Sequence, residues 1–282
     1  MPASLVLAGS YREGAERQSA ALTEPADAQR YRREALLLKL VGENRLGDNW
    51  QVGAISQSHD SQTRITSVLG AGRFRSTTQL DGDDRHSMDM LSGEYHFDTS
   101  FISDGVARVF VTNTQVHQYT FDERAAARTP VFMDRDFHYE QRKRGAELNV
   151  WRDAELRGWN HRFGAGLEYT ETRTEELRDG SLTSLVDGST SSDILGESFP
   201  LRDFPLTKTR EFGAYLSDQV SRGPLKLNRA LRFDDNRLTP IIDPVFATDN
   251  PETSVVAVSD SDFSPKLAAI YRMGDNLDIF LQ

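Results

Sequence analysis

Apolar and polar residues alternate with a period of two over much of the chain, which is typical of β-strands with one apolar face. In segment 210–220 the apolar side carries Phe212, Ala214, Leu216 and Val220. The opposite side carries Glu211, Gly213, Tyr215, Ser217 and Gln219. Helical periodicity is weak, and the best helical candidate, segment 20–40, contains Pro25. The pattern therefore predicts an all-β protein, with Phe212 and Leu216 facing the outside of the sheet.

The alternation predicts about eleven strands, several of them longer than the five or six residues of an ordinary globular strand. We place them near 3–14, 32–45, 48–61, 86–98, 104–121, 136–151, 158–175, 207–221, 224–239, 262–273 and 276–282. Strands of ten or more residues are long enough to cross a bilayer at a tilt. The lengths alone favour a membrane barrel over a soluble β-sandwich.

Short and long connections alternate between the predicted strands. The short ones, rich in Gly, Asp, Asn and Ser, are 44–48, 99–103, 152–157, 221–223 and 274–275. The long polar ones are 15–31, 62–85, 122–135, 176–206 and 240–261. Tight periplasmic turns and long extracellular loops are typical of an outer-membrane barrel. A soluble sandwich with decorated hairpins is the alternative, but the second face is too polar to pack against another sheet.

Both ends of the chain lie in predicted strands. The first twelve residues have an apolar stretch without the leading Lys or Arg of a secretory signal, and they alternate as a strand does. The last six, 277–282, end within an alternating segment. We therefore expect one domain over residues 1–282, a partial barrel cut at both ends.

The composition fits this interpretation. The chain has 33 basic and 43 acidic residues, a net charge of −10, which argues against binding nucleic acid. It contains no cysteine, which excludes disulfides, thiolate metal sites and cysteine nucleophiles. The hydrophobic fraction is only 38%. A barrel strand needs an apolar residue at only every second position, so a low average is expected.

Several segments resemble one family of outer-membrane proteins. They are Thr174-Glu175-Glu176-Leu177-Arg178-Asp179-Gly180, Phe199-Pro200-Leu201-Arg202-Asp203-Phe204-Pro205-Leu206-Thr207, Glu211-Phe212-Gly213-Ala214-Tyr215-Leu216-Ser217-Asp218-Gln219-Val220, Ala230-Leu231-Arg232-Phe233-Asp234 and Ser264-Pro265-Lys266-Leu267-Ala268-Ala269-Ile270-Tyr271. In this order and spacing they resemble TonB-dependent outer-membrane receptors, most closely the haemoglobin, transferrin and lactoferrin receptor branch, over residues 85–282.

The resemblance implies an antiparallel transmembrane β-barrel of 22 strands, of which this chain holds about half, without the plug domain. It implies a receptor and transporter in the outer membrane of a Gram-negative bacterium that takes up haem, haem-protein or ferric siderophore. It further implies the TonB-ExbB-ExbD complex as partner, acting through a plug and TonB box that this chain lacks, and outer-membrane lipid around the barrel. Two alternatives stay open: a plug-free, passive porin-like barrel and a polysaccharide-acting β-protein.

Candidate site residues are few. The histidines at 59, 86, 96, 117, 138 and 161 include no helical metal-binding pair, and we expect His86, His96 and His138 to face the lumen or the loop mouth. Phe199, Phe204 and Phe246 are candidate apolar anchors for a ligand in the long loops.

The remaining acidic clusters favour no catalytic or metal site. Residues 81–84, Asp-Gly-Asp-Asp, lack the further ligands of a calcium loop. The glutamates at 168, 171, 175 and 176 are better explained as a charged barrel interior than as a glycosidase pair. We therefore predict no enzyme, no bound metal and no cofactor.

Overall fold

The computed structural model describes residues 3–16, 26–44, 46–274 and 277–281. Its long strands are β1 (Ala3–Ala15), β2 (Ala28–Glu43), β3 (Asn49–Arg64), β4 (Gln79–Phe97), β5 (Asp104–Arg124), β6 (Val131–Leu156), β7 (Trp159–Ser184), β11 (Leu206–Arg222), β12 (Leu225–Ile241), β13 (Val258–Arg272) and β14 (Asp278–Leu281). Three two-residue strands, β8 (Thr190–Ser191), β9 (Asp193–Ile194) and β10 (Glu197–Ser198), lie between β7 and β11. A 3₁₀ turn, η1 (Gly72–Phe74), precedes β4, and α1 (Pro244–Asp249) precedes β13.

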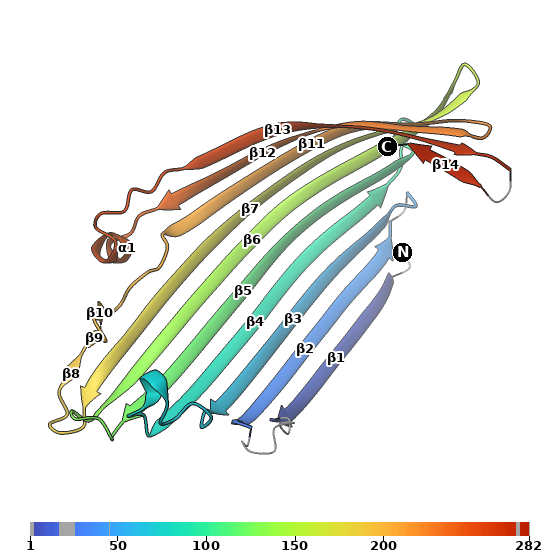
Figure 1. The fold of residues 1–282 in the computed structure, drawn as a ribbon. Coiled ribbons are helices and arrows are strands. Elements are labelled where there is room, and N and C mark those ends of the chain that lie inside the picture. The colour runs from blue at the N-terminus through green and yellow to red at the C-terminus, as the bar shows by residue number, and fades with distance from the viewer. Residues whose placement is uncertain (1–2, 17–25, 45, 275–276, 282) are drawn as a thin grey trace.

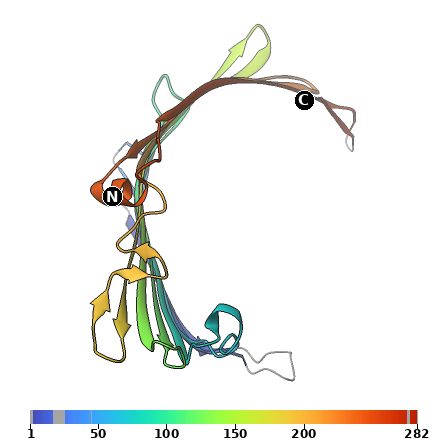
Figure 2. The ribbon, with the colours of Figure 1, turned by 60° about the vertical axis from the view of Figure 1, so that its left-hand side comes forward.

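The long strands form one antiparallel sheet in sequence order, so each strand pairs with its neighbours along the chain. The sheet curls into an open trough, with β1 along one edge and β14 at the other (Figures 1 and 2). This arrangement confirms the predicted antiparallel barrel wall. Within the described ranges, no helix is long and apolar enough to cross a membrane.

The two faces of the sheet differ in composition because neighbouring residues of a strand point to opposite sides. One face carries Asp122, which accepts a hydrogen bond from Thr77 of the segment after η1, and η1 lies on the concave side of the trough in Figure 2. We call this the concave face and the opposite one the convex face.

The convex face carries a band of exposed apolar side chains near the short turns. Its members include Leu5, Leu7, Leu36, Leu38, Leu40, Val52, Leu91, Val109, Val111, Leu148, Leu167, Leu216, Leu231 and Leu267. Aromatic residues lie along the border of this band that is farther from the short turns. There Phe233 is 4.9 Å from Phe263 and 6.5 Å from Phe212 between ring centroids. An outward apolar band bordered by aromatic residues is the lipid-facing surface of an outer-membrane barrel.

The register places Phe212 and Leu216 on the convex face, as the alternation predicts. Phe212 is 38% exposed and Leu216 is 66% exposed. Tyr215, between them in sequence, points to the other side and donates a hydrogen bond to Asn149. The predicted orientation is confirmed.

The strand boundaries show one systematic difference from the sequence prediction. Strand β4 begins at residue 79 instead of 86, β6 begins at 131 instead of 136, and β7 continues to 184 instead of 175. The predicted 122–135 loop is wrong, because only residues 125–130 connect β5 to β6. The buried apolar residues of these extensions, Leu80 and Met133, lie on the concave face, opposite to the apolar side of the membrane-spanning part, so the hydrophobic alternation does not continue into them. Backbone hydrogen bonds to the neighbouring strands hold them in the sheet instead.

The short-turn end is built from tight hairpins. Between β6 and β7 only Arg157 and Gly158 connect the strands, with φ values of 56° and 77°. Positive φ at both central residues is the geometry of a type I′ turn, whose twist matches that of the flanking strands. Glycine at the second position adopts this geometry without strain.

Candidate functional site: the polar concave face and the loops above it

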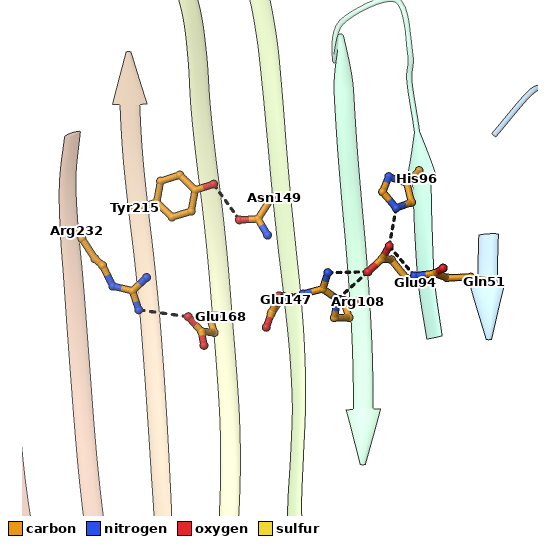
Figure 3. Close-up of polar contacts among 9 residues, drawn as sticks. All are labelled: Gln51, Glu94, His96, Arg108, Glu147, Asn149, Glu168, Tyr215 and Arg232. Atoms are coloured by element: carbon orange, nitrogen blue, oxygen red, sulfur yellow. Dashed lines mark hydrogen bonds and ion pairs between the residues drawn. The ribbon is translucent and has the colours of Figure 1, made fainter. Parts of the chain in front are cut away.

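The concave face carries three groups of hydrogen-bonded polar side chains, which together extend from β3 to β12 (Figure 3). The cross-strand register brings residues 51, 94, 108, 147, 168 and 213 into one row. Rows of this kind line the interior of a barrel, where water or a polar ligand replaces lipid.

Glu94 on β4 is the centre of the first group. Its Oε2 accepts hydrogen bonds from Arg108, at 2.8 Å from Nε and 2.6 Å from Nη2. Its Oε1 accepts one from Gln51 at 2.8 Å and lies 2.6 Å from Nε2 of His96. Arg108 also donates to Glu147 on β6 at 3.0 Å. One guanidinium thereby joins three strands, because its several donors reach two carboxylates at once.

A second link passes over a glycine. Tyr215 on β11 donates a hydrogen bond to Oδ1 of Asn149 on β6 at 2.9 Å, across the intervening strand β7. The residue between them is Gly166, and a Cβ there would lie 2.1 Å from Cε1 of Tyr215 and 2.5 Å from that Oδ1. Glycine is therefore required for the close approach of the two side chains, although β7 stays regularly paired on both sides.

The third link joins β12 to β7. Arg232 donates to Oε2 of Glu168 at 3.2 Å and pairs with Asp234 at 2.7 Å. Each carboxylate that these links use has a basic side chain or an amide as partner. The concave face is consequently polar and hydrogen-bonded along these strands, which suits a hydrated wall more than a tight pocket for one ion.

The loop between β7 and β11 folds back onto the concave face at the end of the sheet that carries the long loops. Leu201 and Arg178 exchange backbone hydrogen bonds of 2.9 and 3.0 Å. Phe199, Leu201 and Ile194 are buried against Met133 of β6. Glu176, also buried here above the membrane-spanning part, accepts a hydrogen bond from the Asp203 backbone at 3.1 Å, and burial raises the pKa of its carboxyl.

The same loop is tied to the next one along the chain. Arg202 donates from Nε to Asp243 at 3.0 Å, and its carbonyl accepts a hydrogen bond from Asn250 at 3.1 Å. Asp243 is also the N-cap of α1, where its carboxylate accepts from the Phe246 backbone. The two longest described loops therefore form one connected structure above the trough.

The aromatic residues proposed from sequence have different surroundings. Phe199 and Phe246 are 7% and 3% exposed, so in this conformation they hold the loops together. Phe204, two residues before β11, is only half-buried. Of these three side chains, Phe204 is the most accessible.

The histidines proposed from sequence separate onto two faces. His86 and His96 lie on the concave face, and His86 is exposed there beside His59. The prediction that His138 faces the lumen is wrong, because residues on the concave side of β6 have odd numbers, such as Met133 and Glu147. His138 therefore lies on the convex face, opposite His117 of β5.

The glutamate cluster proposed from sequence also divides between the faces. Glu168 and Glu176 lie on the concave face, while Glu171 and Glu175 lie on the convex one. Sequence reasoning did not identify Glu94, Arg108 or Asn149. The only sequence signal for them is their position on the polar side of the alternation, and the cross-strand register is needed to bring them together.

Comparison with known proteins agrees with this architecture. The family described as "TonB dependent receptor-like, beta-barrel" matches residues 23–282. No curated protein matches the chain. Similar solved structures include BauA, the ferric preacinetobactin receptor from Acinetobacter baumannii, at 15% identity and a TM-score of 0.57 over 99% of this chain. Another is the hemophore receptor HasR of Serratia marcescens, solved with its hemophore HasA and heme, at 17% identity and a TM-score of 0.62 over 96%. The copper transporter OprC matches at 12% identity and a TM-score of 0.61 over 97%.

The chain spans about two fifths of these solved proteins, covering 42%, 38% and 39% of their lengths. At these low sequence identities, the structural similarity shows a common fold and nothing more specific. The family and the solved proteins are receptors and transporters, not enzymes, and the family is one of Gram-negative outer membranes. With the family match covering nearly the whole chain, the curled antiparallel sheet, the outward apolar band and the polar concave face are accounted for together: the chain belongs to the TonB-dependent receptor-like β-barrel family.

Proposed function

We propose that this chain forms part of the wall of an outer-membrane transporter that takes up an iron complex: haem, a haem-protein or a ferric siderophore. The observation that carries the proposal is the division between the two faces. The convex side presents apolar residues to lipid, while the concave side presents the hydrogen-bonded set around Glu94, Arg108 and Tyr215. A ligand could pass such a wall without meeting lipid.

The loops are the proposed site of ligand capture. Segments 185–205 and 242–257 are connected through Arg202 and Asp243, and such loops on a rigid scaffold commonly bind ligands. Within them Phe204 is accessible for an apolar contact. His86 is exposed on the concave face and is a candidate contact for haem or another ligand.

The haem branch is supported by the ordered sequence segments between residues 85 and 282, and siderophore uptake is the closest alternative. The solved proteins of similar fold include receptors of both kinds. Transport through this wall would be driven by TonB-ExbB-ExbD through a plug outside the chain. A passive porin-like barrel remains the second candidate, because a polar lining also suits diffusion.

The test is growth of an iron-starved Gram-negative strain without its own receptors, expressing the full-length gene that encodes this chain. We expect growth on one of haemoglobin, haemin or a ferric siderophore, and none in a matched strain without TonB. Equal uptake with and without TonB would support the porin-like alternative. No uptake of any iron compound by a correctly inserted barrel would contradict the proposal.

A separate experiment tests the site residues. We expect Phe204→Ala and His86→Ala to weaken binding of the transported ligand to the full-length receptor. Phe101→Ala, an exposed residue in a short turn at the opposite end of the sheet, is the matched control. Unchanged affinity in both site variants would remove these residues from the ligand pathway.

A further inference from the structure

Three potential metal ligands meet on the convex face, in the half of β5 and β6 that is nearer the long loops. His117 and His138 are directly paired across the two strands, and their rings are stacked with centroids 4.2 Å apart. Asp136 lies two residues before His138 on β6 and therefore on the same face. Its Oδ1 is 2.7 Å from Nε2 of His117 and 2.8 Å from Nε2 of His138. The ligand atoms of all three residues lie within 4.8 Å of one another.

These distances fit a bound transition metal after a small adjustment. With metal–ligand bonds of about 2.0–2.1 Å in a tetrahedral site, two ligand atoms lie roughly 3.3 Å apart. Each histidine nitrogen would therefore move away from the carboxylate oxygen by about half an ångström. Side-chain rotation at the sheet surface supplies this movement, while the paired backbones of β5 and β6 hold the three residues in place.

The cluster is accessible to ions from water. The side chains of His117, Asp136 and His138 are 43%, 33% and 54% exposed. His117 lies six residues beyond Val111 on the same face of β5, and Val111 is the last apolar residue of the band on that strand. At about 3.3 Å per residue it is roughly 20 Å along the strand from that residue, outside the hydrocarbon layer.

The neighbouring charges favour a cation. On β6 the next outward residue is Asp134, which accepts a hydrogen bond from Tyr119, and Asp179 of β7 is the partner of Asp136 across the strands. On the other side, Arg85 of β4 pairs with His117 in register, but its guanidinium is 3.2 Å from Asp60 and is directed toward that carboxylate. The remaining partner, Leu177 opposite His138, carries no charge.

We propose that His117, Asp136 and His138 form a binding site for a divalent transition metal on the outer wall of the receptor, above the membrane and on the opposite face from the ligand pathway. Two imidazole nitrogens and a carboxylate oxygen suit zinc or copper, with a fourth position open to water. Bound metal would link β5 to β6 across their paired backbones. Affinity falls as the pH is lowered, because a protonated imidazole has no lone pair to donate.

The experiment uses the full-length receptor, purified in detergent and stripped of metal with a chelator, and Zn²⁺ as the probe. We expect wild-type receptor to bind one Zn²⁺ more per chain than the H117A/H138A variant in equilibrium dialysis. We expect Asp136→Asn to weaken that binding at least tenfold. The matched control is H59A/H86A, which removes the cross-strand histidine pair of the concave face, whose rings are 6.3 Å apart.

Two outcomes would overturn the proposal: equal Zn²⁺ binding by wild type and H117A/H138A, or the same loss in H59A/H86A alone. Cu²⁺ electron paramagnetic resonance provides a readout that does not depend on folding of the H117A/H138A variant. The H59A/H86A receptor should show hyperfine coupling to two imidazole nitrogens at neutral pH, and loss of that coupling under acid. A spectrum without nitrogen coupling would refute the site.

Discussion

Glu171 on β7 provides the most informative test of the electrostatics of this barrel wall. It lies on the convex face, two residues beyond Tyr169 toward the long loops, and is therefore outside the apolar band. Its side chain is only 4% exposed, yet four basic groups surround it: Lys208 at 2.8 Å, Arg144 at 3.0 Å, Arg173 at 3.4 Å and Arg210 at 3.6 Å. One carboxylate thus contacts four basic side chains from three strands.

Replacing Glu171 with Gln keeps its size and removes its charge. An ion pair near the surface contributes about 0.2–1 kcal/mol, and salt reduces this further. Four such pairs, with the repulsion that is left among four unbalanced cations, give an expected loss of about 1–3 kcal/mol. The full-length Glu171→Gln receptor should unfold at a lower urea concentration than wild type at pH 7 and low salt. Glu252→Gln, in the exposed loop before β13, is the control and should unfold as wild type does.

The loss should depend on pH in a defined direction. The hydrogen bond from Lys208, together with Arg144 and Arg173, lowers the pKa of Glu171 from 4.5 to about 2. A carboxylate whose pKa is lowered on folding contributes stability above the pKa of the unfolded state and loses it as the pH falls. The difference between wild type and Glu171→Gln should therefore be largest above pH 5 and disappear between about 4.5 and 2. An undiminished difference at pH 2, or no difference at pH 7, would refute this reasoning.

Three further substitutions in the full-length receptor, and one experiment on the isolated 282-residue chain, test other parts of the structure. Gly166→Ala places a Cβ 2.1 Å from the ring of Tyr215 and should cost about 1–3 kcal/mol in urea unfolding, since that ring must move. Asp218→Asn removes the negative charge that Arg229 contacts at 2.6 Å on the lipid-facing side near the short turns; we expect reduced stability, restored when Arg229 is also replaced by Leu. Arg202→Ala removes the side-chain contact with Asp243, one of the contacts between the two long loops, so limited proteolysis should cut them faster while the barrel stays intact. The 282-residue chain alone should not give the heat-modifiable band of a closed barrel in gel electrophoresis, because unpaired backbone groups at the edges of β1 and β14 cost several kcal/mol each in lipid.

The sequence by itself determines which side of each membrane-spanning strand faces lipid. Phe212 and Leu216 are oriented as predicted because side chains alternate strictly along a strand, and lipid requires every second residue to be apolar. The short turns at 44–48 and 221–223 were also predictable, because Gly47 and Gly223 mark positions where the backbone has positive φ, whereas the turn predicted at 152–157 lies at residues 157–158. The number and order of the long strands follow from these two signals.

Only the tertiary structure decides how residues meet across strands. The contacts of Glu94 with Arg108, and of His117 with Asp136 and His138, depend on the register between strands. A shift of one residue would move each of these side chains to the opposite face. The extensions of β4, β6 and β7 do not continue the apolar alternation of the membrane-spanning part, so pairing between strands and the packing of Met133 against the β7–β11 loop decide their length. Hydrophobic patterning acts along one strand, whereas register and curvature arise from hydrogen bonds and packing between strands, which is why the sites required the structure.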